Sequence, residues 1–140
     1  MVAGSVPARA PGWANLGMDI VSAQRVRQMV ADHGESFLLR MLTQQELADC
    51  RTDEGLNLLT VCGRIAAKEA AFKTLRVADR ILPWLDIEVH RADGGWPLIE
   101  LRGRAAQLAQ DAGIEGITVS ISHDVDYAVA VGAPVLSTGN

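Results

Sequence analysis

The feature that most constrains the fold is a helical stretch over residues 56–75 that is followed by an abrupt change of period. Its apolar residues recur at intervals of three, four and seven and so share one helix face: Leu58, Val61, Ile65, Phe72 and Leu75. Directly afterwards, Leu85, Ile87 and Val89 alternate with polar residues, which predicts a half-buried strand. A chain that combines these two patterns is expected to contain a long helix packed on a sheet.

Shorter signals place further elements before that helix. The apolar stretch over 16–21 predicts a strand, and a helix is expected to follow and to end at Gly34. A helical turn is expected over 36–42. The capping-box pattern Thr43-Gln44-Gln45-Glu46 predicts another helix from Gln44.

The second half of the chain is predicted to be rich in hairpins. Asp93-Gly94-Gly95 marks a turn before a returning strand at 98–101. A short helix over 104–112 and two strands at 117–122 and 127–131 complete the order. Because hairpins pair neighbouring strands in antiparallel fashion, we expect an α+β fold with a mainly antiparallel sheet against the long helix.

Composition places the chain among single globular domains. Its 140 residues are 49% hydrophobic, and the net charge of -4 argues against a general nucleic-acid binder. No apolar run reaches the ~18 residues of a membrane span, and the first residues lack a signal-peptide pattern. We therefore expect a cytoplasmic protein without membrane partners. Its one domain spans 15–132, between a flexible leader at 1–14 and a flexible tail at 133–140.

Most catalytic motifs are absent. The sequence has no phosphate-binding G-x-x-x-x-G-K-[ST], no G-x-G-x-x-G and no H-E-x-x-H. Ser122-His123-Asp124 holds the residue types of a hydrolase triad, but consecutive strand residues point to opposite faces. Cys50 and Cys62 are too few for a disulfide framework.

Three isolated polar sites stand out. Asp19 lies within an apolar stretch, where it either caps the following helix or binds a partner, because an unpaired buried carboxylate is costly. Glu69 and Lys73, one turn apart beside the apolar stripe, fit either a surface ion pair or a functional site. His123 ends an alternating strand and fits either a turn residue or a ligand-binding residue.

Two separated carboxylates without a histidine or cysteine cluster suit a hard cation. Mg²⁺ is commonly held by one or two carboxylates together with water and substrate phosphates. A lysine one turn away would neutralise a phosphate. Asp19, Glu69 and Lys73 therefore permit Mg²⁺-dependent phosphate or pyrophosphate chemistry, without singling it out.

Taken in order, these segments resemble the holo-acyl-carrier-protein synthase family of 4′-phosphopantetheinyl transferases. The matching blocks are Gly17-Met18-Asp19-Ile20-Val21 with Arg25, Arg40-x-Leu42-Thr43-x-x-Glu46, Gly63-Arg64-Ile65-Ala66-Ala67-Lys68-Glu69-Ala70, Asp86-Ile87-Glu88-Val89, Gly95-Trp96-Pro97 and Ser120-Ile121-Ser122-His123. The resemblance extends from Leu16 to Val131 and implies the 4′-phosphopantetheinyl transferase-like fold.

The resemblance also implies a reaction. Coenzyme A donates its phosphopantetheine to a serine hydroxyl of an apo acyl carrier protein and leaves as adenosine 3′,5′-bisphosphate. It implies that Asp19 and Glu69 hold Mg²⁺, that Glu69 is the base for the serine, and that Lys73 contacts the phosphate and stabilises the transition state.

Further roles follow from the same resemblance. The residues that match the coenzyme A site, besides Lys73, are Arg64, Pro97, Ser122 and His123. Arg25 and Arg40 are implied to contact the acidic carrier protein. Family members of this size are homotrimers with active sites between subunits, so a homotrimer is expected.

The chain departs from the family pattern in places. Ile65 replaces an aromatic residue, Trp96 replaces a lysine, and Arg76-Val77-Ala78 replaces a Gly-rich turn. These departures keep two alternatives open. One is a module that binds carrier proteins or coenzyme A without transfer. The other is a Mg²⁺-dependent enzyme that cleaves pyrophosphates with water.

Overall fold

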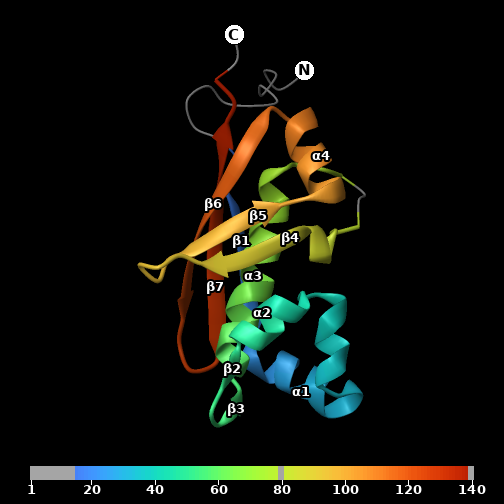
Figure 1. The fold of residues 1–140 in the computed structure, drawn as a ribbon, viewed down its shortest axis with the longest axis vertical. Helices are drawn as coiled ribbons and strands as arrows, with labels where there is room; N and C mark the ends of the chain where they lie inside the picture. Colours follow the sequence, from blue (N-terminus) through green and yellow to red (C-terminus); the bar gives the residue numbers. More distant parts are fainter. Residues whose placement is uncertain (1–14, 79–80, 139–140) are drawn as a thin grey trace, which may run out of the picture.

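The molecule is organised around one long helix, α3 (Leu58–Thr74), which packs against a three-stranded antiparallel sheet (Figure 1). The strand order is β1-β7-β6, from Gly17–Ser22, Tyr127–Leu136 and Ile114–His123. The computed structural model describes residues 15–78 and 81–138. The leader predicted at 1–14 therefore lies outside the described residues. The predicted α+β fold, with an antiparallel sheet against a long helix, is confirmed.

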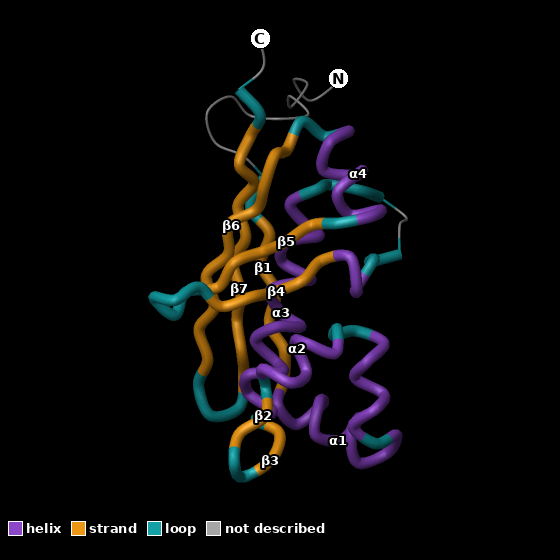
Figure 2. The backbone as a smooth tube through the Cα atoms, in the orientation of Figure 1, coloured by secondary structure: helices purple, strands orange, loops and turns teal. Residues whose placement is uncertain are grey.

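Smaller elements surround α3 and the sheet (Figure 2). The hairpin of β4 (Ile87–Arg91) and β5 (Pro97–Leu101) contacts both α3 and β6, and α4 (Gly103–Asp111) packs on β6. Near the start of α3 lie the remaining elements: α1 (Ala23–His33), the 3-10 turn η1 (Glu35–Arg40), α2 (Gln44–Asp49), and the two-residue strands β2 (Arg51–Thr52) and β3 (Gly55–Leu56).

Side-chain caps fix where the helices begin. Thr43 and Glu46 form the predicted capping box of α2, and the Asn57 side chain accepts from the Thr60 amide at the start of α3. The cap of α1 is Ser22, which accepts from the Arg25 amide, so the alternative that Asp19 caps this helix is wrong. Asp19 lies inside β1 instead.

Two strand boundaries differ from the sequence pattern. Leu85 belongs to the 3-10 turn η2 (Trp84–Asp86), so β4 begins only at Ile87. β7 continues to Leu136, beyond the expected end at Val131 and into the segment predicted as a flexible tail. Pro134 interrupts the strand signal, but β1 pairs with β7 only as far as Gly132. Beyond that point no strand within residues 15–78 and 81–138 pairs with this edge of β7, so the missing N–H of proline is tolerated.

The sheet reaches α3 closely because small residues line the contact. Ala66, Ala67 and Ala70 are fully buried on the helix. A Cβ atom on Gly17 would lie 2.0 Å from the Ala70 carbonyl oxygen, and one on its register partner Gly132 would lie 3.3 Å from the same atom. Only glycine therefore lets β1 lie against the helix backbone at this point.

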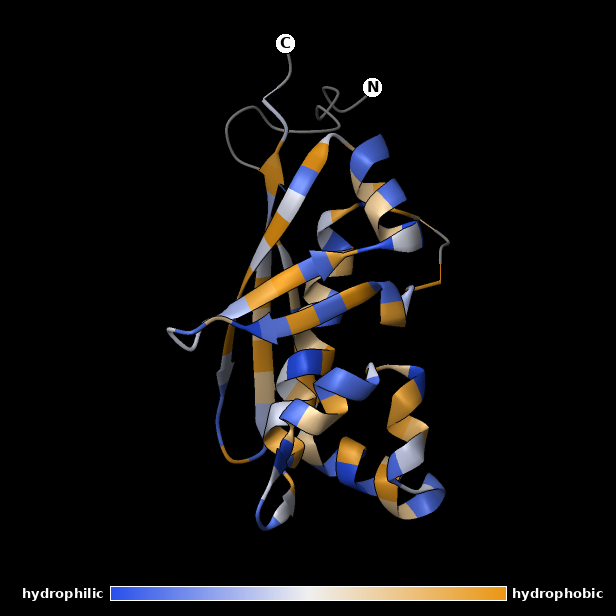
Figure 3. Ribbon diagram, in the orientation of Figure 1, coloured by the Kyte–Doolittle hydropathy of each residue, from blue (hydrophilic) through white to orange (hydrophobic). Residues whose placement is uncertain are grey.

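Polar and apolar residues alternate along β6, as Figure 3 shows. Ile117 and Val119 are buried against the core, whereas Thr118, Ser120 and Ser122 face outward. Among the described helices, none combines the length and the apolar character that crossing a membrane requires.

Candidate functional site

β1 and α3 bring Asp19, Glu69 and Lys73 together. The Lys73 Nζ lies 3.3 Å from Asp19 Oδ1 and donates to the Met18 carbonyl at 2.8 Å. Asp19 acts on Glu69 through both its charge and a hydrogen-bonding interaction. Lys73 is thus ion-paired with Asp19 from another element, in place of the surface pair with Glu69 that the sequence left open.

The local sequence explains this arrangement. Alternate residues of a strand share a face, so Asp19 points to the same side as Gly17. Since Gly17 lies against Ala70, the Asp19 side chain emerges beside the next turn of the helix. Glu69 and Lys73 are four residues apart on α3 and therefore face the strand together.

The two carboxyl groups are electrostatically frustrated. Burial raises the pKa of Glu69 to about 7, and the hydrogen bond and charge of Asp19 add to this effect. The Oδ2 atom of Asp19 is buried and has no hydrogen-bond partner. A buried carboxylate oxygen without a donor, beside a second carboxyl, fits a divalent cation with oxygen ligands.

A second acidic group, Glu88, His90 and Glu100, offers ligand atoms within 4.8 Å of one another. The Arg102 guanidinium pairs with both carboxylates, so this cluster already contains a fixed cation. Burial alone would raise the pKa of Glu88, but hydrogen bonds from Thr43 and Arg102 lower it overall. Asp19 and Glu69 are therefore the better candidates for a metal.

The predicted nucleotide residues Arg64, Pro97 and His123 line one pocket, together with residues from α3, the β4–β5 hairpin and β6. The side chain of Arg64 is almost fully buried, and its Nε atom has no hydrogen-bond partner. Ser122 is exposed on β6 and is not among the residues that line this pocket.

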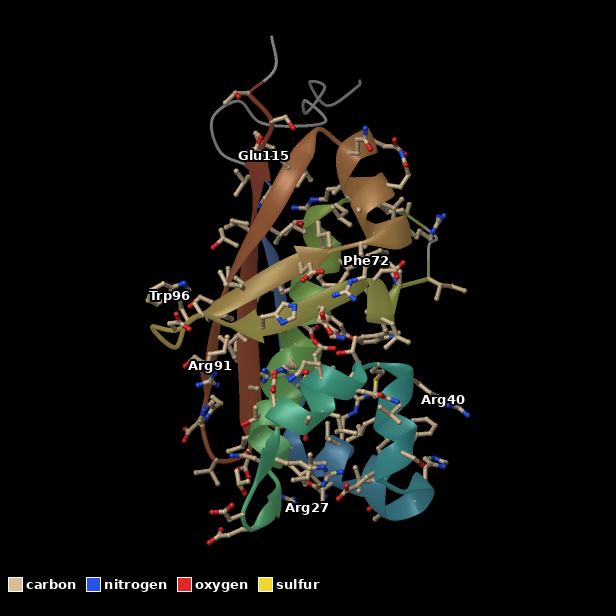
Figure 4. The ribbon with its side chains drawn as sticks, viewed as in Figure 1. Arg27, Arg40, Phe72, Arg91, Trp96 and Glu115 are labelled. Atoms are coloured by element: carbon tan, nitrogen blue, oxygen red, sulfur yellow. The ribbon has the colours of Figure 1, made fainter. Side chains whose placement is uncertain are left out.

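Sequence reasoning missed two basic residues of the same pocket, His90 and Arg91. They end β4 immediately before the turn to β5, and Figure 4 shows Arg91 close to β6. The hairpin signal placed them near Pro97, since Arg91 and Pro97 are register partners. Nothing in the sequence alone placed the hairpin against Arg64.

The pocket and the carboxylates lie on opposite faces of α3. Arg64 and Glu69 are five residues apart, which corresponds to about 140° around a helix with 3.6 residues per turn. Glu69 instead lines a groove with Arg25 of α1, whose other walls are mainly apolar: Ile20, Val21, Val26, Met29, Met41, Ile65 and Trp84. Within one chain, the two predicted halves of the site are therefore separated by the helix.

Arg25 and Arg40 have different surroundings. Arg25 is exposed on α1, and its charge acts on Glu69. The Arg40 guanidinium lies 4.6 Å from the centre of the Phe37 ring. Figure 4 shows Arg40 on the outer side of η1, away from the strands, so the structure brings only Arg25 to the carboxylates.

Lys68, next to Glu69 in the sequence, points into the core. Its Nζ donates to Glu46 Oε1 at 2.5 Å and to the carbonyls of Met41 and Trp84 at 2.6 and 3.0 Å. Burial lowers the pKa of Lys68, and the charge of Glu46 opposes that effect. This lysine joins α2 and η2 to α3 and has no access to a substrate.

Comparison with known proteins identifies the family of the chain. A model of the 4′-phosphopantetheinyl transferase superfamily matches residues 15–131. A holo-[acyl-carrier-protein] synthase of Moorella thermoacetica is 40% identical over 117 residues, covering 82% of this chain and 88% of that protein. One of Desulforudis audaxviator is 37% identical over 115 residues, covering 82% and 87%.

Solved structures show the same fold. The holo-ACP synthase of Plasmodium yoelii superposes with a TM-score of 0.77 at 29% identity, covering 90% of this chain and 97% of that chain. The Helicobacter pylori enzyme, solved in complex with coenzyme A, has a TM-score of 0.73 at 31% identity, with 86% and 99% covered. The chain belongs to the 4′-phosphopantetheinyl transferase superfamily and, within it, to the holo-[acyl-carrier-protein] synthases.

Proposed function

We propose that this enzyme transfers 4′-phosphopantetheine from coenzyme A to a serine of an apo acyl carrier protein, with Mg²⁺, and releases adenosine 3′,5′-bisphosphate. The observation that carries the proposal is the pair of Asp19 and Glu69 beside Lys73, with one carboxylate oxygen buried and unpartnered. The relatives named holo-[acyl-carrier-protein] synthases support the substrate pair.

The residues divide the reaction among them. Asp19 and Glu69 would hold the ion, which supplies positive charge to the pyrophosphate when bound. The serine Oγ attacks the phosphorus that bears the pantetheine, and the bond from that phosphorus to the bridging oxygen breaks. Glu69 would take the serine proton directly or through water. Lys73 stabilises charge on the transferred phosphoryl group.

The nucleotide end of coenzyme A fits the other face of α3. Arg64 and His123 supply donors for phosphate, and Pro97 supplies an apolar wall for a base. Because the helix separates this pocket from Glu69, one coenzyme A molecule would reach both halves only if they came from different copies of the chain. We infer a homotrimer in which the metal half of one subunit meets the nucleotide half of its neighbour.

The outward face of the sheet supports this assembly. Met18, Ile20, Val131 and Val135 are between 38% and 60% exposed on neighbouring strands. An apolar sheet face of this kind commonly marks a protein–protein interface. Arg25, at the rim of the Glu69 groove, would meet the acidic carrier protein, with Arg40 as a second and more distant contact.

The direct test mixes purified protein, apo carrier protein, coenzyme A and Mg²⁺, and measures the intact mass of the carrier. A gain of one phosphopantetheine that EDTA abolishes supports the reaction and its metal dependence. An unchanged carrier mass with several carriers, despite tight carrier binding, would instead favour a binding module. Release of adenosine bisphosphate without a carrier would indicate a hydrolase.

Subunit sharing has its own test. Glu69→Ala and Arg64→Ala would each be inactive alone, because each removes one half of every site. Unfolding and refolding an equal mixture would restore intact sites, about a quarter of the total if subunits of a cyclic ring assemble at random. No recovery from mixed trimers of normal mass would show that both halves act within one chain.

A further inference from the structure

The turn that ends α3 has a strained backbone at Arg76. Among the described residues, Arg76 is the one non-glycine residue with a positive φ, at 52°. It follows the C-cap residue Leu75, and its amide donates to the Lys73 carbonyl at 3.3 Å. Glycine usually occupies this position after a helix, because a side chain there costs conformational free energy. An arginine in this conformation calls for a reason outside the backbone.

In this conformation the Arg76 side chain lies against Leu16, the residue that precedes β1. One guanidinium nitrogen donates to the Leu16 carbonyl at 3.3 Å, and Lys73 Nζ donates to the Met18 carbonyl at 2.8 Å. Leu16 and Met18 are two residues apart, so both cations lie along the same edge of the strand. Both also line one groove with Phe72, Val77 and Ala78.

Lys73 and Arg76 differ in whether a carboxylate neutralises their charge. Lys73 is paired with Asp19, whereas the contact described for Arg76 is with a neutral carbonyl. The groove has no acidic residue among those that line it. The Arg76 guanidinium is therefore a cation without a carboxylate partner among the described residues. It is exposed beside the catalytic helix and free to exchange a weak acceptor for an anion.

Arg76 lies beside the functional residues of α3. Glu69 and Lys73 are one turn apart on the helix, and Lys73 lines the same groove as Arg76. A guanidinium presents paired donors that match two phosphate oxygens. In coenzyme A, the anionic group next to the phosphate bound by Lys73 is the second phosphate of the diphosphate.

We propose that Arg76 is a substrate-binding residue for the diphosphate of coenzyme A, which it reaches by leaving the Leu16 carbonyl. The inference rests on the proposed function, because it assigns the diphosphate to the Lys73 side of α3. The left-handed backbone at position 76 is the conformational cost of placing this cation beside Lys73.

Two substitutions separate binding from backbone strain. Arg76→Gly and Arg76→Ala both remove the cation, but only glycine relieves the positive φ. We expect both to raise KM for coenzyme A by about tenfold to a hundredfold, the usual range for a charge-assisted contact, while KM for the apo carrier stays unchanged. Arg76→Gly should also raise Tm. Arg104→Ala, at an exposed arginine of α4, is the matched control and should leave both KM values unchanged.

A merely structural role predicts a different pattern. If Arg76→Ala lowers Tm but neither variant changes KM for coenzyme A, the proposal is overturned. If the wild type transfers no phosphopantetheine, the proposed function fails and calorimetric binding of coenzyme A with Mg²⁺ decides instead. Weaker binding by both Arg76 variants would then still support the contact. Equal binding, or no binding by the wild type, would overturn it.

Discussion

Lys68 and Lys73 are the two lysines of the chain, and they lie five residues apart on one helix in opposite environments. Lys68 is fully buried and bonded to Glu46 and two carbonyls. The side chain of Lys73 is 52% exposed and reaches across to Asp19 on β1. The segment from Lys68 to Lys73 therefore carries one charge that holds the fold together and another that lies exposed beside Asp19.

The difference shows why residue type alone does not assign a role. A buried ion pair is strongly destabilised when one partner is removed, because the other charge stays behind without compensation. An exposed pair contributes little to stability, so the position of Lys73 beside two repelling carboxyl groups points to chemistry. Substitutions on the two sides of α3 should accordingly affect different measurements.

The largest expected effect is on catalysis at Glu69. Glu69→Gln should lower kcat by about 10²–10⁴, the range for loss of a general base. Its Tm should stay the same or rise, because a neutral amide removes the repulsion from Asp19. The carrier-mass time course and a thermal melt measure both, with the exposed Glu115→Gln as control. Full activity in Glu69→Gln would remove this residue from the mechanism.

The same substitution at the two lysines tests the comparison directly. Lys68→Met should lower the free energy of unfolding by about 3–5 kcal/mol, because Glu46 is left buried without its partner. Lys73→Met should change it by less than about 1 kcal/mol and should instead lower kcat. Urea unfolding of both variants provides the measurement. Equal losses of stability would contradict the division between the two faces.

Gly17 tests how tightly the strand must approach the helix. Gly17→Ala places a Cβ atom 2.0 Å from the Ala70 carbonyl oxygen, so β1 must move outward. We expect a loss of about 1–3 kcal/mol in stability, typical of overpacking, together with weaker Mg²⁺ binding as Asp19 moves away. Gly116→Ala is the control, since a Cβ atom there meets nothing within 4 Å. Identical behaviour of the two variants would rule out the close contact.

The pH dependence of stability should reveal the raised pKa of Glu69. In the metal-free protein the pKa of Glu69 lies above its ordinary value, at about 7. Its contribution to stability is therefore present at low pH and is lost as the pH rises through 7. Mg²⁺ competes with the proton, so its affinity should increase with pH until Glu69 is ionised. Melts in EDTA and in Mg²⁺ should diverge across this window, and Glu69→Gln should remove the EDTA slope.

The smallest effect on activity is expected at Arg25, at the rim of the groove that Glu69 lines. Arg25→Ala should raise KM for the carrier a few-fold and weaken its salt dependence, because rim charges act mainly on association. KM for coenzyme A should not change. Steady-state kinetics at low and high salt distinguish the two substrates. A carrier KM that stays constant across salt in both proteins would place carrier binding elsewhere.

Local patterns predicted the elements whose signals are local. The helix predicted over 56–75 and the capping box of α2 appear in the structure, since both depend on neighbours within a turn or two. The one-sided apolar stripe does not, because α3 is buried on all sides over residues 61–68. The end of β7 did not follow its local signal. Among the described residues β1 pairs with β7 only as far as Gly132, and this leaves the strand edge at Pro134 unpaired. How far each strand is paired depends on the assembled sheet and cannot be predicted from neighbouring residues in the sequence.

The sequence predicted which residues belong to the site better than it predicted how they are arranged in space. The resemblance carried by the ordered motifs assigned Asp19, Glu69 and Lys73 to one site, and the fold places them next to one another. The burial of Lys68 and the separation of Arg64 from Glu69 depend on which helix face meets which neighbour. His90 and Arg91 join the pocket only because the β4–β5 hairpin folds over α3.

The pairing of β1 with β7 has a consequence for how the protein is made. Gly17 and Gly132 are register partners separated by 132 − 17 = 115 residues. During synthesis β1 leaves the ribosome well before β7, so it cannot gain its partner in the sheet until the residues between them have followed. The nascent chain can form its helices first, and the strand that carries Asp19 is secured among the last steps.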